Sequence, residues 1–131
     1  MTVLPDTSVW IDYFRGVDPA ATELDRLLAD EPPVICGPIL AELVAGLVPE
    51  RRGEVWLALS SLPFVELGRD AWTLAGELAH ALRGQGANVP LLDLLIAVAA
   101  VRGDAALWTR DTDLDRIAGV LPDLRLHRSG A

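Results

Sequence analysis

Four acidic residues lie in apolar parts of this sequence, where few basic residues stand nearby. They are Asp6, which ends the first apolar run, Glu42 and Asp93, which each interrupt a longer run, and Asp111, which follows a fourth. A charge in apolar surroundings costs several kcal/mol unless an opposite charge or a metal ion compensates it. Because few basic residues accompany these acids, the sequence favours a divalent cation, and carboxylate oxygens are ligands that Mg²⁺ and Mn²⁺ prefer.

Each acid also has a structural explanation. Asp6 and Asp111 could each cap the helix that follows. Asp93 could complement the dipole in the first turn of a helix. Glu42 and Asp93 are harder to explain in this way, because no basic residue stands three or four positions from either of them. Asp113, two residues after Asp111, is a further candidate for the same site.

The composition predicts one globular domain over residues 1–131. About half of the residues, 51%, are apolar, which allows a core and argues against disorder. The longest apolar stretch, after Asp93, is about half as long as a bilayer span requires, so we expect no membrane association. The N-terminus lacks the pattern of a signal peptide, and the one cysteine, Cys36, cannot form an internal disulfide. These features predict a cytoplasmic protein.

The charge of the chain restricts its chemistry. The net charge of −8 opposes binding to nucleic-acid phosphates unless bound metal ions cancel several of the acids. All 11 basic residues are arginine, and lysine is absent. A P-loop site, a protein-kinase site and a lysine Schiff base all need lysine, so these three chemistries are excluded.

Short apolar segments alternate with helical patterns along the chain. Strands are predicted at residues 2–4, 34–36, 64–67, 106–108 and 124–127, and helices at 8–15, 19–30, 38–47, 50–60, 69–83, 90–101 and 112–118. This alternation predicts an α/β fold with a parallel sheet. Asp6 and Asp111 would then follow strands, at the edge where ligands of open parallel sheets bind. Pro5 is placed at the last residue of the first strand, because proline removes a hydrogen bond from a sheet.

Four segments resemble the PIN-domain family, specifically the VapC-type toxin ribonucleases of type II toxin–antitoxin pairs. They are Leu4–Asp12, Ile39–Leu43, Pro90–Ala97 and Leu107–Asp111, and the resemblance covers essentially the whole chain. It implies a single PIN domain with a central parallel sheet of four or five strands flanked by helices. One departure is Pro5, which stands where many members of the family have an aliphatic residue.

The resemblance gives the four acids a catalytic role. It implies a site made of Asp6, Glu42, Asp93 and Asp111 and a Mg²⁺ cofactor, for which Mn²⁺ can substitute. We expect Asp6 and Asp93 to be the firmest metal ligands, with the other two acids completing the shell directly or through water. Family members supply hydroxyl groups beside the acids at the positions of Thr7 or Ser8 and of Thr109.

The activity implied by the resemblance is metal-dependent cleavage of RNA by an endoribonuclease toxin. The resemblance also implies a homodimer and a small VapB-like antitoxin that masks the site. Two other classes stay open. A catalytically silent PIN-like module would only bind a partner or RNA, and it would not need to keep the four acids. A metal-dependent phosphatase or phosphotransfer domain would need Asp-x-Asp or a late lysine, where this chain has Asp6-Thr7-Ser8 and no lysine.

Overall fold

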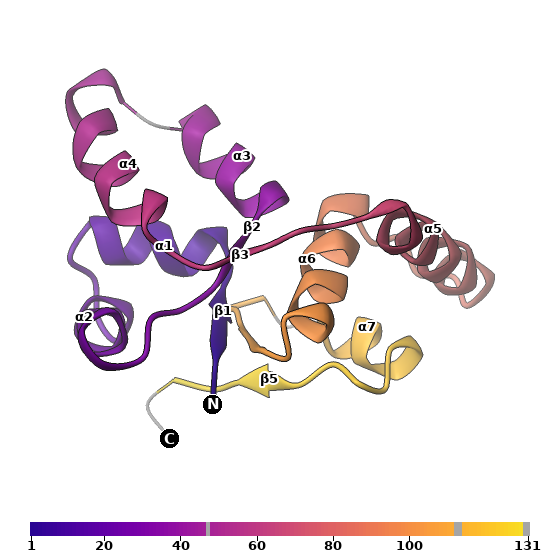
Figure 1. Cartoon of the computed structure of the whole chain (residues 1–131). Coiled ribbons are helices and arrows are strands. Elements are labelled where there is room, and N and C mark those ends of the chain that lie inside the picture. Colours follow the sequence, from indigo (N-terminus) through magenta and orange to yellow (C-terminus); the bar gives the residue numbers. More distant parts are fainter. Residues whose placement is uncertain (47, 112–113, 130–131) are drawn as a thin grey trace.

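The computed structural model describes residues 1–46, 48–111 and 114–129, and Figure 1 shows helices on both sides of the β1 strand. The strands are β1 (Val3–Pro5), β2 (Ile35–Cys36), β3 (Phe64–Val65), β4 (Ala106–Trp108) and β5 (Leu126–His127). The helices are α1 (Thr7–Phe14), α2 (Ala20–Asp30), α3 (Gly37–Gly46), α4 (Arg52–Ser60), α5 (Arg69–Gly84), α6 (Leu91–Arg102) and α7 (Leu114–Val120), with the 3₁₀ turn η1 (Pro49–Arg51) before α4. The predicted α/β fold is confirmed, and the first two residues of the predicted 112–118 helix lie outside the described residues.

The main sheet contains three parallel strands in the order β1-β4-β5. Its register pairs Leu4 with Leu107 and Leu107 with Leu126, so β4 lies in the middle. β2 and β3 form a separate two-stranded parallel sheet. The expectation of one central sheet of four or five strands is therefore wrong in its strand count, although every predicted strand is present.

Pro5 helps to explain why the two sheets do not join into one ladder. The carbonyl of Thr2 and the N–H of Asp6 both bond to the β4 side, at 2.9 Å each. The carbonyl of Val3 faces the other way and accepts the N–H of Val34, just before β2, at 3.0 Å. Because successive residues of a strand direct their hydrogen-bonding groups to alternate sides, Pro5 faces β2, where it has no N–H to donate. The predicted place of Pro5 as the last residue of the strand is confirmed.

The core is built around α6, and its burial explains its almost unbroken apolar sequence. α6 packs against both β4 and α5, and Figure 1 shows it between β1 and α5. Every residue from Leu94 to Ala100 is buried, as is the whole of β4. Each large apolar side chain buried in this way stabilises the fold by about 1.5–3 kcal/mol. Although α6 is so apolar, no helix in the described part of the chain is long and apolar enough to cross a membrane.

Cys36 ends β2 inside the core, as its apolar context predicts. Burial raises the pKa of its thiol to about 11, and the negative charge of Glu42 acts in the same direction. The thiol therefore stays protonated at neutral pH and packs as a small apolar side chain.

Candidate active site

Three of the predicted site residues lie at the carboxyl ends of two adjacent strands. Asp6 directly follows β1, whereas Thr109 and Asp111 follow β4. The two strands pair in parallel, and the N–H of Asp6 donates to the carbonyl of Trp108 at 2.9 Å. The sequence could not establish that these strands are neighbours. Because they are, Asp6 and the segment after β4 share the edge where open parallel sheets bind ligands.

Asp6 is half-buried and receives hydrogen bonds from the start of α1 and from the segment after β4. Its Oδ1 accepts from the hydroxyl of Ser8 at 2.6 Å and from the backbone N–H of Val9 at 3.1 Å, which makes Asp6 the N-cap of α1. Its Oδ2 accepts from the hydroxyl of Thr109. The capping role considered from the sequence is thus present. Asp6 can still bind a metal ion while it caps the helix, because a carboxylate offers about four lone-pair positions.

Thr109 connects the ends of β1 and β4 through its hydroxyl group. The residue is 6% exposed, and its hydroxyl donates to Asp6 while accepting the backbone N–H of Asp111 at 3.0 Å. A buried hydroxyl that both donates and accepts is fixed in orientation. Thr109 therefore links the carboxylate of Asp6 to the backbone of Asp111, which is exposed. Asp113 and the first two residues of the predicted 112–118 helix, which Asp111 could cap, lie outside the described residues.

Glu42 reaches the site from α3. The hydroxyl of Thr7 donates to Glu42 Oε1 at 2.8 Å, and Thr7 follows Asp6 directly in the chain. Glu42 is exposed in spite of its apolar neighbours in the sequence. The apolar sequence around Glu42 therefore does not bury it, because Ala45 and Gly46, one turn further along α3, face the solvent with it.

Asp93 is half-buried in the first turn of α6. α6 leads into the amino end of β4 and so runs antiparallel to it, which directs its first turn toward the carboxyl edge of the sheet. α6 also packs against α3, the helix that carries Glu42. The dipole interpretation also fits this position, since a carboxylate is stabilised in the first turn of a helix.

The side chains at this edge offer oxygen atoms as donors. Carboxylates and hydroxyls are hard ligands, which suit Mg²⁺ or Mn²⁺. Within residues 1–46, 48–111 and 114–129, no three acidic, histidine or cysteine side chains stand close enough together to form a complete metal site. Mg²⁺ often binds through only one or two protein carboxylates, with water and substrate phosphate as its other ligands. The donor chemistry therefore fits a hard divalent cation.

The sequence interpretation missed an ion pair beside the site. Arg110 Nη1 lies 3.3 Å from Asp12 Oδ2 and joins the end of β4 to α1. The available signal was position, because Arg110 stands between two predicted site residues, Thr109 and Asp111. The spacing along the chain did not show that Asp12 would meet it.

A known family covers most of this fold. Residues 3–120 match the PIN domain family, a range that runs from β1 to the end of α7 and includes all four acids. The chain belongs to the PIN-domain family. The resemblance indicated by the four sequence segments is thereby confirmed.

This PIN domain is similar over most of its length to bacterial toxin ribonucleases. It is 35% identical over 125 residues to Ribonuclease VapC11 of Mycobacterium tuberculosis, covering 90% of this chain and 92% of the relative. Among solved structures, it resembles VapBC2 from Rickettsia felis bound to a DNA fragment from their promoter, with a TM-score of 0.78, 25% identity and coverage of 97% and 98% of the two chains. A toxin–antitoxin complex from Klebsiella pneumoniae gives a TM-score of 0.69 at 27% identity, with coverage of 90% and 94%.

The position of the Thr109 hydroxyl predicts the effect of removing it. Thr109→Val keeps the shape of the side chain but takes the hydroxyl from between Asp6 and the N–H of Asp111. We expect the free energy of unfolding, measured by urea denaturation, to fall by about 1–3 kcal/mol. The control is Thr73→Val, because Thr73 is exposed and its hydroxyl donates to the carbonyl of Arg69 within α5; we expect this change to lower the free energy of unfolding by less than about 0.5 kcal/mol. Equal losses in the two variants would contradict the connecting role of Thr109.

Proposed function

We propose that residues 1–131 act as one PIN domain, the toxin of a type II toxin–antitoxin pair and an endoribonuclease. In this proposal the protein hydrolyses phosphodiester bonds of RNA in the cytoplasm, with Mg²⁺ as cofactor and Mn²⁺ as a substitute. One observation carries the proposal: Asp6 is held between the ends of β1 and β4. Its support is the 35% identity to Ribonuclease VapC11 over 90% of this chain.

Asp6 and Asp93 are the proposed metal ligands, and Glu42 and Asp111 complete the shell directly or through water. When bound, Mg²⁺ supplies an activated water and stabilises negative charge on the phosphate and on the leaving oxygen. A carboxylate of the shell takes up the proton of the attacking water. Asp113 is a further proposed member of the site.

Hydrogen bonds within the chain restrain two of these acids, Asp6 and Glu42, before any substrate arrives. Ser8 and the N–H of Val9 bond to one oxygen of Asp6, and Thr109 bonds to the other. Thr7 restrains the carboxylate of Glu42. Groups that are already oriented need little rearrangement during the reaction, which is the largest single source of catalysis in many enzymes.

The proposed protein partner is a VapB-like antitoxin. A hollow of about 200 Å³ between α1, α3 and α4 supports this assignment, because it combines apolar lining from Phe14, Leu43 and Val55 with the carboxylate of Glu42. A partner segment packed into this hollow would cover Glu42. The antitoxin would thereby mask one of the four proposed catalytic acids.

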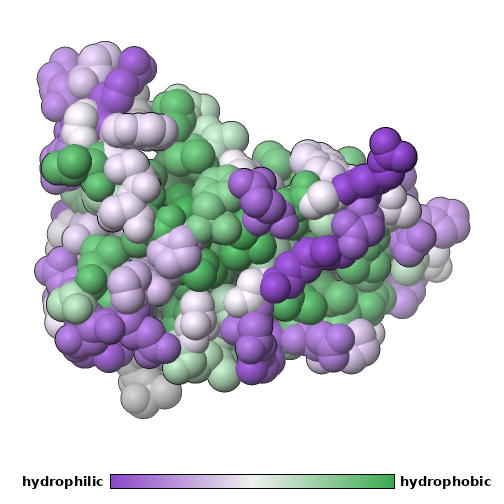
Figure 2. Space-filling view, viewed as in Figure 1, coloured by the Kyte–Doolittle hydropathy of each residue, from purple (hydrophilic) through white to green (hydrophobic). Residues whose placement is uncertain are grey.

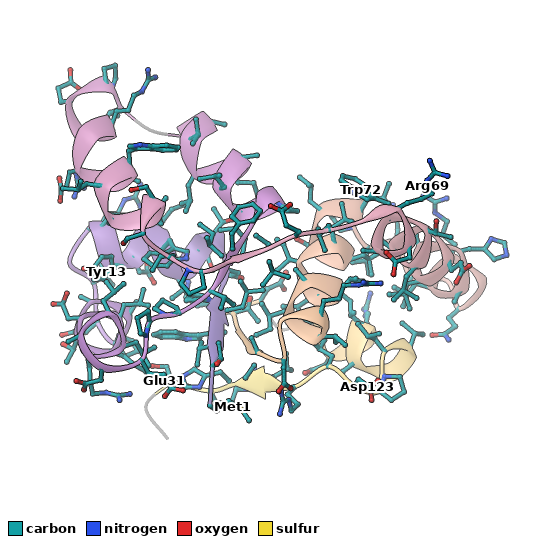
Figure 3. All side chains as sticks on the ribbon, in the orientation of Figure 1. Met1, Tyr13, Glu31, Arg69, Trp72 and Asp123 are labelled. Atoms are coloured by element: carbon teal, nitrogen blue, oxygen red, sulfur yellow. The ribbon has the colours of Figure 1, made fainter. Side chains whose placement is uncertain are left out.

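The proposed quaternary structure is a homodimer formed through the face where β3 meets the starts of α5 and α6. Large apolar side chains gather there: Phe64, Trp72, Leu91 and Leu92 are between 43% and 57% exposed. Figure 3 shows Trp72 at the start of α5, and Figure 2 shows apolar surface across the middle of the same view. Contiguous exposed apolar surface of this kind marks protein interfaces.

Trp72 gives a test of the homodimer. Trp72→Glu places a charge in the proposed interface, and we expect it to raise the dimer dissociation constant about 30-fold or more. Sedimentation analysis of the wild-type chain should give twice the 14.1 kDa protomer mass, and the variant should shift toward the protomer. Val17→Glu is the control, because Val17 is 45% exposed on the connection between α1 and α2. A monomeric wild-type chain would disprove the homodimer, and the nuclease proposal would be unaffected.

Asp93→Asn tests the catalytic role of the acids. We expect purified, antitoxin-free protein to cleave a cellular RNA pool into discrete products with Mg²⁺ or Mn²⁺ and not with EDTA. Asn keeps the size of Asp93 but loses its charge, so cleavage should slow about 100-fold or more. Asp123→Asn is the matched control, because exposed Asp123 lies on the connection between α7 and β5 (Figure 3).

The control variant should cleave like the wild-type chain. The nuclease proposal fails if folded, metal-loaded wild-type protein leaves the RNA pool intact. The assignment of Asp93 fails if Asp93→Asn and Asp123→Asn cleave equally fast.

A further inference from the structure

Two arginines follow the carboxyl ends of neighbouring strands, next to the proposed catalytic acids. Arg110 comes two residues after the end of β4, and Arg128 comes directly after β5. β1, β4 and β5 are parallel and adjacent, so both arginines share the edge of the sheet with Asp6. Both also line one hollow of about 230 Å³.

This hollow touches the groups that hold Asp6. Its lining includes Val9 and Thr109, which both donate hydrogen bonds to the carboxylate of Asp6. A group bound in the hollow would therefore lie next to the proposed reaction centre. A strand of RNA that presents one phosphate to the acids would present a neighbouring phosphate here.

Each arginine is positioned by a carboxylate and still exposed. Arg110 lies 3.3 Å from Asp12, and its side chain is 61% exposed while that of Asp12 is 14% exposed. Arg128 lies 3.3 Å from Asp115, and its side chain is 54% exposed. A guanidinium has five N–H donors in a planar fork that matches two phosphate oxygens. Nη1 of Arg110 and Nη2 of Arg128 are the atoms that meet the carboxylates, and the five donors of a guanidinium allow it to bind a phosphate at the same time.

The charge of the whole chain favours a local basic site in an enzyme that acts on RNA. At a net charge of −8, the protein repels polyanions at long range. Another paired arginine, Arg125, bonds to Asp104 at 2.6 Å. These two residues precede β5 and β4 and so lie at the opposite, amino edge of the sheet. Arg110 and Arg128 differ from that pair in standing at the edge that carries the acids.

We infer that Arg110 and Arg128 form a phosphate-binding subsite that holds the RNA strand beside the catalytic acids. Asp12 acts as a positioning residue for Arg110. The inference rests on the proposed nuclease function and adds to it the residues that receive the substrate backbone. Phosphate contacts orient a nucleic acid without reading its bases, so this subsite contributes affinity and placement and not sequence preference.

The test measures binding of a single-stranded RNA oligonucleotide over a range of salt concentrations. Asp93→Asn serves as the background, so that the RNA is bound without being cut. Adding Arg110→Gln or Arg128→Gln should raise the dissociation constant about tenfold each. Each should also reduce the slope of log affinity against log salt by about 0.7, the value for one phosphate contact on a single strand. Arg110→Lys should keep the salt slope and lose part of the affinity, because it keeps the charge and loses the fork.

Arg125→Gln is the matched control, since it removes an exposed, carboxylate-paired arginine from the other edge of the sheet. It should leave both affinity and salt slope within about twofold of the background. A parallel measurement of KM for RNA cleavage, with the same arginine variants in the catalytically intact chain, should show the same order. Melting temperatures of the three Arg→Gln variants should agree, which separates lost binding from lost folding.

The possible results distinguish failure of the phosphate-binding subsite from failure of the proposed nuclease function. If the intact chain cleaves RNA, but Arg110→Gln and Arg128→Gln match Arg125→Gln in affinity, salt slope and KM, the subsite is wrong and the nuclease stands. If the intact chain neither cleaves nor binds RNA, the nuclease proposal and the subsite both fail.

Discussion

The parallel pairing of β1 with β4 is the contact on which the site depends, because it brings together groups 103 positions apart in the chain. Asp6 follows one strand, and Thr109, Arg110 and Asp111 follow the other. The pairing is buried, with α6 packed against β4 and α1 against β1. The site therefore forms only when the core forms. The hydroxyl of Thr109 then connects the two strand ends beyond the last backbone pair.

Electrostatics decide what this edge can hold. Acidic side chains that share one edge of the sheet repel one another in a chain of net charge −8. The free-energy cost of this repulsion falls where hydrogen-bond donors face the carboxylates. Asp6 receives the N–H of Val9 at the start of α1, and Asp93 lies in the first turn of α6. The N-terminus of a helix stabilises negative charge. The edge thus combines anionic oxygens with helix ends and arginines, which under the proposed function would bind a cation and a phosphate.

The helices and strands predicted from the local sequence are present in the structure. α6 and β4 were identifiable because residues buried on all sides leave an almost unbroken apolar run. The division into two sheets was not, because it depends on which side of the strand Pro5 faces. The exposure of Glu42 was also hidden, since α3 is apolar beyond the face that it packs.

The ion pairs between residues far apart in the chain could not be predicted from the sequence. The hydroxyl residues beside the acids came from resemblance, but Asp12 with Arg110 and Arg128 with Asp115 are separated by too many residues for spacing to reveal them. The burial of the four tryptophans also depends on tertiary contacts. Trp10 and Trp108 are buried, whereas Trp56 and Trp72 are more than half exposed, and residue type alone does not distinguish the two pairs.

The proposed function requires that the carboxyl edge around Asp6 bind a divalent cation, and calorimetric titration of the purified protein with Mn²⁺ measures this binding. Asp6→Asn is the decisive variant, because asparagine caps a helix as well as aspartate does and so keeps α1 in place. We predict that the wild-type chain and Asp123→Asn bind Mn²⁺ with equal affinity, and that Asp6→Asn binds about 10–100-fold more weakly. Equal binding of Mn²⁺ by Asp6→Asn, or no binding by the folded wild-type chain, would show that this edge is not the cation site.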